Sequence, residues 1–440
     1  MKALSKKEVF LVGLMLFSMF FGAGNLIFPP FLGQSAGNQT WLAMLAFAIT
    51  AVGFPILGVV AVAKSGGLNT LAGRVHPRFA SIFTVIIYLA IGPFLAIPRA
   101  GSLPFEMAVA PYLSESFSLT LAMVIYTLVF FLANYWLALS PGDLIDRMGK
   151  ILTPILLILI FIVFGGGLIH PIAAYGEPMG SYVESPFVQG FLDGYLTMDT
   201  LAALIFGIII AVTIRSKGIE DEEEIVSGTI RAGVIAGGFL FLIYAMLAHL
   251  GAMSGAAFGM TDNGAQTLTH VVTSLFGIWG AVLLAVIFTL ACISTSVGLT
   301  AACGQYFSEH TSLSYKAWVG IITLVSMALA NLGLTKILVV SIPILVAIYP
   351  VAIMVILLGL MDRYLKGDPF VYRLVVVLTG AVSTVDALEQ TGVGLPGITQ
   401  GMHGLPFYEM GLGWIVPALL GLIIGMIKPL IQQGSVQIEK

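Results

Sequence analysis

The stretch FFGAGNLIFPP, residues 20–30, decides how this chain folds. It lies within an apolar run over residues 9–32, which is long enough for a membrane helix of about 20 residues. However, Gly22, Gly24 and Pro29 disfavour an uninterrupted helix, because glycine lowers helix stability and proline lacks a backbone N–H. Backbone groups freed by a break cannot face lipid, so they must line an enclosed cavity or bind a polar group. The stretch therefore predicts a broken first helix; alternatively, the glycines only allow close helix packing.

The composition is that of a membrane protein. Charged residues make up 9 % of the 440 residues and hydrophobic residues 58 %, whereas a soluble domain has about 25 % charged residues. No polar segment is long enough for a soluble domain, so we expect residues 1–440 to form one all-α polytopic membrane domain. Cys292 and Cys303 lie in one predicted helix, about 16 Å apart along its axis, which is too far for a disulfide.

Hydropathy predicts about twelve membrane spans. The third and eighth are longer than one crossing requires, which implies tilt or a continuation outside the bilayer. The approximate ranges are 9–33, 41–63, 80–111, 118–140, 144–169, 189–214, 226–251, 275–305, 316–333, 337–361, 371–388 and 409–432.

The basic residues predict how these spans are oriented. If the N-terminus is cytoplasmic and the spans alternate, all of the 19 Lys and Arg residues except Arg99 and Lys336 fall at or near cytoplasmic ends. The segments 170–188, 252–274 and 389–408 contain no Lys or Arg, and all three are then external. We therefore expect both termini in the cytoplasm, and we expect segment 252–274 to form an external cap over a central pathway.

The sixth span is the second one that contains polar residues where a membrane helix should be apolar and uninterrupted. Gly190, Asp193 and Gly194 are followed by TMDT at 197–200, and only residues 201–214 form a clean apolar helix. The two interrupted spans are five apart, so a second unit would enter the membrane with inverted orientation. Matching breaks in two inverted halves are the best sequence indication of a secondary-transporter site. The predicted units are 1–170, 189–361 and an additional pair of helices at 371–432.

The eighth span contains three consecutive hydroxyl residues, Ser294, Thr295 and Ser296. Any one of them could bond a carbonyl of its own helix. Because three in a row cover most of the helix circumference, we expect at least one to face the protein interior. Hydroxyl and unwound carbonyl oxygens are hard, neutral ligands that suit a small cation such as Na⁺.

Four stretches together resemble the bacterial branched-chain amino acid:cation symporter family. They are FFGAGNLIFPP, IGPFLAIPRAGSLPFE at 91–106, GYLTMD at 194–199 and the serine-rich eighth span. The resemblance covers essentially the whole chain, and it implies import of leucine, isoleucine and valine with Na⁺, or with H⁺, across the bacterial cell membrane. It also implies the inverted five-plus-five fold of the leucine:sodium symporter class with two appended helices. We expect no cofactor besides the coupling ion, and neither nucleic acid nor an obligate protein partner.

The resemblance also implies the substrate site. The wider class has a G-x-G-N sequence at the first break, and GAGN at 22–25 matches it. There, the N–H groups of Ala23 and Gly24 would bind the substrate carboxylate, which agrees with the preference of helix N-termini for anions. The other implied substrate-binding residues flank the two breaks and are Phe20, Asn25, Thr197, Met198 and Asp199.

The cation site follows from the same resemblance. Carbonyls just before the first break, near Ser18 and Phe21, would coordinate Na⁺. On the eighth helix the class uses a carbonyl and two hydroxyls three and four residues later, which match Ala291, Ser294 and Thr295.

Asp199 departs from the sodium symporter archetype, which has no acid at this position. It could pair with the substrate ammonium, ligate a cation or carry a proton. Alternatively, it could cap the helix that starts at Thr200, since an acid is stabilising near a helix N-terminus.

Arg99 and Glu106 are the other charged residues of interest. Seven residues apart, they would share one face of a continuous helix, about 10 Å apart along its axis. Charges inside a membrane are functional hypotheses by default. Because Pro98 and Pro104 disturb the helix here, we expect a structural or gating ion pair near the external surface, rather than a substrate contact.

Other classes of function fit the sequence less well. An enzyme would need a nucleophile–base pair or a metal cluster, and the chain has no compact Ser/His/Asp set, no HExxH and no Cys/His ligand spacing. We therefore expect no enzyme activity and no transition-metal site. A channel would show a filter repeat or charged rings. A sensor with a transporter fold, or a carrier for another small neutral solute, remains the alternative.

Overall fold

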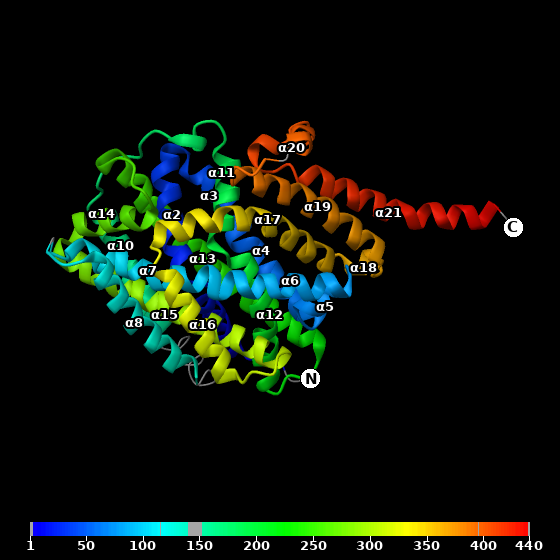
Figure 1. Ribbon diagram of the computed structural model, residues 1–440, viewed down its shortest axis with the longest axis horizontal. Helices are drawn as coiled ribbons and strands as arrows, with labels where there is room; N and C mark the ends of the chain where they lie inside the picture. Colours follow the sequence, from blue (N-terminus) through cyan, green and yellow to red (C-terminus); the bar gives the residue numbers. More distant parts are fainter. Residues whose placement is uncertain (1–2, 115, 140–151, 395, 439–440) are drawn as a thin grey trace.

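The computed structural model describes residues 3–114, 116–139, 152–394 and 396–438, which form helices with no strand among them (Figure 1). The helices are α1 (Lys6–Phe20), α2 (Ala23–Ala36), α3 (Thr40–Ala48), α4 (Phe54–Ser65), α5 (Leu68–Gly73), α6 (Pro77–Leu89), α7 (Ala96–Ala108), α8 (Leu119–Ala138), α10 (Thr153–Ile169), α11 (Pro186–Asp193), α12 (Asp199–Ser216), α13 (Glu222–Phe258), α14 (Gly264–Phe276), α15 (Ile278–His310), α16 (Tyr315–Ala330), α17 (Leu334–Leu360), α18 (Asp362–Leu365), α19 (Pro369–Gln390), α20 (Pro396–Met402) and α21 (Ile415–Ile438).

The helices confirm the prediction of an all-α polytopic membrane protein. Within the described part of the chain, eight helical stretches are long and apolar enough to cross a membrane, and α10, α16 and the Ile415–Ile427 part of α21 are shorter apolar helices. Each predicted span coincides with a helix or with consecutive helices. The start of the fifth span, with Arg147 and Lys150, lies outside the described residues.

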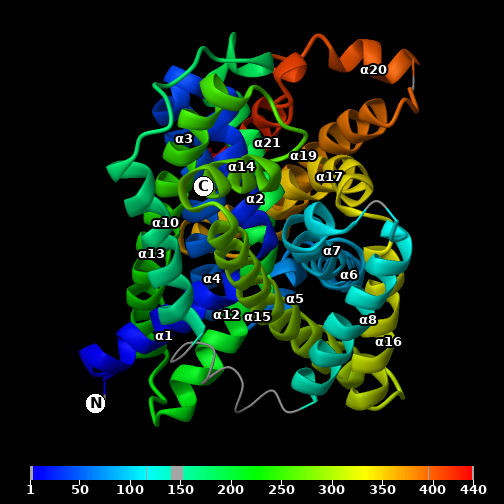
Figure 2. The ribbon, with the colours of Figure 1, turned by 90° about the vertical axis from the view of Figure 1, so that its left-hand side faces the viewer.

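The two ends of the bundle carry different segments. Figure 2 shows the N-terminus and the link between α12 and α13 at one end, and the segment before α11 together with α20 at the opposite end. These are the ends that the basic residues predict as cytoplasmic and external. The direction in which the protein sits in a membrane stays a prediction.

Both predicted helix breaks are present. The helix α1 ends at Phe20 and α2 begins at Ala23, with Phe21 and Gly22 in extended conformation between them. In the sixth span, the short 3-10 helix η7 (Gly194–Thr197) follows α11, and Met198 then adopts a left-handed conformation with φ 69° before α12 begins. The first and sixth membrane helices are therefore each built from two half-helices.

Glycines hold the outer half-helix α2 close to its neighbours. A Cβ atom at Gly251 of α13 would lie 1.9 Å from the carbonyl oxygen of Pro30. At Gly33 of α2 it would lie 1.9 Å from the carbonyl oxygen of Ala248, and at Gly264 of α14 it would lie 1.8 Å from that of Ile27. The close packing proposed for Gly22 and Gly24 is found at both, where a Cβ atom would lie 2.8 Å from the Thr295 hydroxyl and 2.6 Å from Nη2 of Arg99. It continues further along α2, where it fixes this half-helix against α13 and α14.

Two π-helical segments also shape the bundle. The segment η2 (Ile49–Gly53) separates α3 from α4, and η3 (Ala90–Phe94) separates α6 from α7. Gly92 is non-helical, with φ −90° and ψ −119°, next to Pro93. The long third span therefore kinks, which the prediction of tilt or continuation did not include, because proline removes a ladder hydrogen bond and glycine tolerates the resulting backbone.

Segment 252–274, predicted as an external cap, is mostly helical. Its first part extends α13 to Phe258, so the seventh span is longer than predicted. Most of the remainder forms α14, whose buried face includes Leu268 and Val272. Because α14 packs beside α2, the segment supports the outer half of the broken first helix.

The packing at Gly251 can be tested with a matched pair of variants in α13. Gly251→Ala should destabilise the protein by about 1–3 kcal/mol, because the new methyl group overlaps the Pro30 backbone. Gly238→Ala has open space around its Cβ and should be neutral or slightly stabilising. Thermal unfolding of the purified protein in detergent measures both, and equal midpoints for the two variants would contradict the packing.

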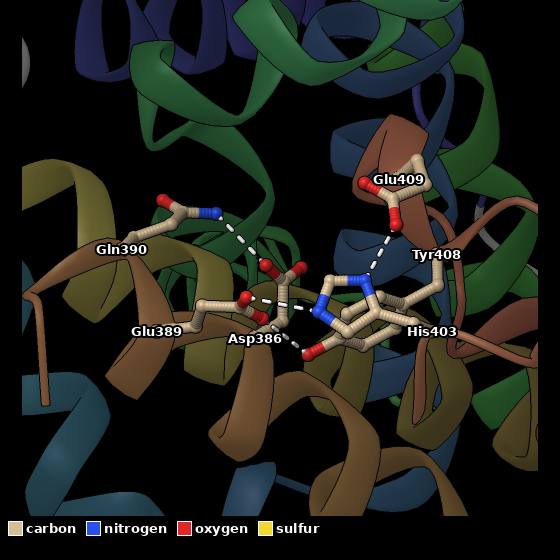
Figure 3. A network of polar contacts seen from close by, with 6 residues as sticks. All are labelled: Asp386, Glu389, Gln390, His403, Tyr408 and Glu409. Carbon is tan, nitrogen blue, oxygen red and sulfur yellow. Dashed lines mark hydrogen bonds and ion pairs between the residues drawn. The ribbon is translucent and has the colours of Figure 1, made fainter. Parts of the chain in front are cut away.

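A histidine ties three segments together at the end that carries α20 (Figure 3). The imidazole of His403 contacts Glu409 of the short helix η8 (Tyr408–Met410) at 2.5 Å and Glu389 of α19 at 3.1 Å. Tyr408 donates to Glu389 at 3.0 Å, and Asp386 lies on the same face of α19. The carboxylate of Glu409, aided by that of Glu389, raises the pKa of His403 above its ordinary value, because both favour the imidazolium.

The segment from α20 to η8 should therefore dock less firmly as the pH rises. A pKa raised in the folded state stabilises the contact below the ordinary histidine pKa of about 6.5, and that stabilisation is lost as the pH passes through the raised value. Amide hydrogen exchange of residues 396–411, compared from about pH 5 to 9 after correction for intrinsic rates, measures the effect. His403→Gln should abolish the pH dependence and His170→Gln should keep it; pH dependence surviving in His403→Gln would refute the assignment.

Candidate functional site

The two helix breaks are joined by one hydrogen-bond network. The side-chain amide of Asn25, on α2, donates to the carboxylate of Asp199, on α12, at 2.7 Å. Tyr244 of α13 donates to the same carboxylate oxygen at 2.7 Å and also accepts a hydrogen bond from Asn25. The other side of the Asn25 amide accepts from the Gly22 N–H at 2.8 Å. The break in the first helix is therefore bound directly to the break in the sixth.

The carboxylate of Asp199 does not cap α12. The residue before the helix is Met198, with no capping side chain, and the Thr200 N–H donates to the hydroxyl of Tyr349 at 3.2 Å. The backbone N–H of Asp199 itself donates to the hydroxyl of Thr197 at 3.4 Å. Of the alternatives for Asp199, capping by its side chain is therefore wrong, although an acid at this position still favours the helix dipole.

A cavity of about 30 Å³ lies between the breaks, and we call it the central cavity. It has a polar side at the breaks and an apolar side that includes Phe206 and Leu299. The structure brings all seven predicted substrate-binding residues to its wall, namely Phe20, Ala23, Gly24, Asn25, Thr197, Met198 and Asp199. Its volume has room for one or two water molecules, so a larger solute requires the wall to move.

The predicted cation ligands lie close to the same break. Thr295 of α15 donates to the carbonyl oxygen of Phe21 at 3.0 Å. Ser294 donates to the carbonyl oxygen of Ala291 on its own helix at 2.9 Å, and Ser18 is buried on α1 one turn before Phe21. The structure thus places the Thr295 hydroxyl against the first break, whereas the Ser294 hydroxyl bonds within its own helix.

Arg99 and Glu106 do not form the ion pair that we expected. The guanidinium of Arg99, 3 % exposed, donates to the carbonyl oxygens of Leu196 at 2.7 Å and Thr197 at 3.3 Å. Glu106 instead accepts from the N–H of Leu334 at 2.5 Å, at the start of α17, where a carboxylate is favoured. Each side chain satisfies backbone groups freed at a helix end, so Arg99 belongs to the central site rather than to the external surface.

A second, larger cavity lies next to the central one. This outer cavity, of about 580 Å³, is mostly apolar and is lined by α2, by α17 and by residues 179–182 and 260–264. Arg99 lines both cavities, and its guanidinium carbon lies 5.5 Å from the centre of the Phe28 ring. Arg99 therefore stands between the two cavities, and Phe28 contacts it from the outer one.

Several residues that support the site could not be found by motif. Thr50, in the π-helical segment η2, donates to the carbonyl of Phe191 at 2.8 Å, and Thr200 donates to the carbonyl of Thr50 at 2.9 Å. Thr50 therefore joins the two halves of the sixth helix. The only sequence signal for Thr50 and Tyr244 is a polar atom within an apolar span. No group of three or more His, Cys, Asp or Glu residues in the described ranges could hold a metal ion.

A polar site between two broken helices in a membrane bundle defines a secondary-transporter architecture. Solved structures share this fold. Mhp1, a nucleobase-cation-symport-1 family transporter, in a closed conformation with bromovinylhydantoin bound, matches with a TM-score of 0.59 and 14 % identity, over 97 % of this chain and 92 % of that one. MhsT in complex with L-phenylalanine matches with a TM-score of 0.59 and 15 % identity, over 97 % and 99 %. At these identities the likeness shows the fold alone.

The sequence comparisons identify the family. Residues 5–432 match the family described as "Branched-chain amino acid transport protein", and the chain belongs to it. It is 41 % identical over 441 residues to the branched-chain amino acid permease BraB of Bacillus subtilis, covering 100 % of this chain and 99 % of the relative. It is also 41 % identical to the branched-chain amino acid transport system 2 carrier protein of Pseudomonas aeruginosa, covering 96 % and 95 %. The protein is therefore a membrane transporter and not an enzyme.

The hydrogen-bond network at the breaks can be tested by a double-mutant cycle. Tyr244→Phe and Asn25→Ala each remove a donor to the buried Asp199 carboxylate and should each destabilise the protein by about 1–3 kcal/mol. Because the two donors also bond each other, the double variant should differ from their sum by at least about 0.5 kcal/mol. Tyr175→Phe, which instead removes a bond to His249, is the control and should be additive with Asn25→Ala. Additivity of the first pair in thermal unfolding would show that no network exists.

Proposed function

We propose that the protein imports leucine, isoleucine and valine by Na⁺-coupled symport through alternating access. The observation that carries this proposal is the position of all seven predicted substrate-binding residues around one cavity, where the broken helices meet. The family match and the names of the relatives, which are branched-chain amino acid permeases and carriers, support the substrate class.

The central cavity suits the three parts of such a substrate. Orphan N–H groups at the start of α2, from Ala23 and Gly24, attract the carboxylate. The carboxylate of Asp199 attracts the ammonium, and Phe206 and Leu299 provide an apolar wall for the aliphatic side chain. Since the cavity holds only about 30 Å³, the substrate enters when the half-helices α2 or α12 move apart.

Na⁺ binds, in this proposal, between the first break and α15. The hydroxyl of Thr295 and the carbonyl oxygen of Phe21 are 3.0 Å apart, close enough to share one small cation. Rotation of the Ser294 hydroxyl away from the carbonyl of Ala291 would free two more oxygens for the ion. A cation bridging α1 and α15 stabilises one arrangement of the two, and this differential stabilisation is what couples ion to substrate.

The orientation of the site in the membrane follows from the position of the outer cavity. The outer cavity is lined by residues 179–182 and 260–264, within segments that lack Lys and Arg. We therefore place the outer cavity on the external side of the bacterial cell membrane and both termini in the cytoplasm. Rocking of the half-helices of the first and sixth spans against α7, α8, α15 and α16 would close the external path and open the internal one.

Uptake of labelled isoleucine into proteoliposomes with an imposed inward Na⁺ gradient tests the proposal. A K⁺ gradient and a pH gradient are the controls. Accumulation driven by Na⁺ alone is expected. Accumulation driven by the pH gradient alone would reject Na⁺ coupling and move the coupling to Asp199. Isoleucine binding without accumulation under any gradient would reject transport in favour of a sensor, and absence of binding would reject the substrate class.

One double variant separates the binding of Na⁺ from that of isoleucine in the same assay. Replacing Ser294 and Thr295 together by Ala removes two candidate Na⁺ ligands, and it should raise the Na⁺ concentration for half-maximal uptake at least about tenfold, the loss expected for one strong oxygen ligand. The isoleucine affinity at saturating Na⁺ should change less. Normal Na⁺ activation of the double variant, at normal expression, would remove the cation assignment.

A further inference from the structure

The guanidinium of Arg99 is a buried cation without a carboxylate partner. It donates only to the carbonyl oxygens of Leu196 and Thr197, and its Nε atom is buried with no hydrogen-bond partner. No carboxylate of the described residues, including Asp199, lies within ion-pairing distance of it. A buried charge that is not paired costs several kcal/mol. The position therefore favours a ligand that brings a negative charge.

The same guanidinium lies against the start of α2. A Cβ atom at Gly24 would be 2.6 Å from Nη2 of Arg99, so the glycine lets the guanidinium lie directly against this helix start. Of the N–H groups around the first break, that of Gly22 is occupied by Asn25, while those of the first turn of α2 have no partner within the helix. A cation and a helix N-terminus thus meet at the wall of one cavity, and both attract an anion.

An acidic side chain lies at the same cavity. The carboxylate of Asp199 is bound by Asn25 and Tyr244 and does not pair with Arg99, although both residues line the central cavity. A small cavity that presents an unpaired cation and an acid, held apart by separate partners, fits a solute that carries both charges on adjacent carbons. An α-amino acid zwitterion has this arrangement.

We propose that Arg99 binds the carboxylate of the transported amino acid, together with the N–H groups of Ala23 and Gly24. This inference rests on the proposed function and adds a substrate-binding residue from α7, outside both helix breaks. Because Arg99 lines both the outer and the central cavity, binding of the carboxylate also draws onto the substrate the side chain that separates the two cavities. Arginine suits this role, since its planar fork can hold two carboxylate oxygens at once.

Equilibrium binding to the purified full-length protein tests the proposal. Isoleucine is compared with isoleucine amide, which has the same side chain and ammonium but no carboxylate. Arg99→Gln should weaken isoleucine binding about 10–100-fold, as expected for losing charge-assisted hydrogen bonds, and should leave amide binding unchanged. Arg99→Lys keeps the charge but loses the fork, so its loss of isoleucine affinity should be smaller.

A matched arginine serves as the control. Arg74 is half-buried, pairs with Asp362 at 3.4 Å and lines neither cavity, so Arg74→Gln should bind both ligands as the wild type does. If Arg99→Gln discriminates isoleucine from the amide as well as the wild type does, the assignment of Arg99 is wrong while the proposed function stands. If Arg99→Gln does not fold, the test uses Arg99→Lys instead. An Arg99→Lys protein that prefers isoleucine over isoleucine amide as strongly as the wild type does would overturn the assignment. Wild-type protein that binds no branched-chain amino acid would overturn both proposals.

Discussion

The site depends on one buried contact, the hydrogen bonding of Asp199 by Asn25 and Tyr244. Each broken helix exposes backbone groups that lipid cannot satisfy, so neither break is tolerable unless protein encloses it. The side-chain amide of Asn25 makes a hydrogen bond at each break. Its oxygen accepts from the N–H of Gly22, and its nitrogen donates to the carboxylate of Asp199 on α12. Tyr244 adds the long helix α13 to the junction. The contact therefore holds two half-helices and a support helix at one point.

Close packing around the outer half of the first helix explains why this junction can exist. Gly33 and Gly251 let α2 and α13 approach to backbone contact, which brings the Tyr244 hydroxyl within reach of the breaks. On the opposite side, Thr50 in a π-helical segment bonds both halves of the sixth helix. Irregular backbone at Gly92 precedes the helix that carries Arg99. The two helix breaks thus line the central cavity, and the two π-helical segments lie beside the elements that form it, as expected for a functional site inside a membrane.

The breaks could be predicted from the sequence, because glycine and polar residues within an apolar run contradict a continuous membrane helix; Pro29, which was also expected to disfavour the helix, lies inside α2. The polar positions of GAGN and TMD also predicted one wall of the central cavity. Tyr244 could not be found this way, since its role depends on how a 37-residue helix packs against α2. The predicted ion pair between Arg99 and Glu106 was wrong, because an argument from residue spacing within one helix cannot take account of carbonyl groups freed at a break in another helix. Those carbonyls belong to Leu196 and Thr197, about a hundred residues further along the chain.

A structure determined with isoleucine and Na⁺ bound tests the central claim most directly. We expect density for isoleucine between the two breaks, with its carboxylate at Ala23, Gly24 and Arg99 and its ammonium at Asp199. The volume of the central cavity should then exceed about 30 Å³. Density for isoleucine only in the outer cavity, with the Asn25–Asp199–Tyr244 contact unchanged and the central cavity still closed, would contradict the account.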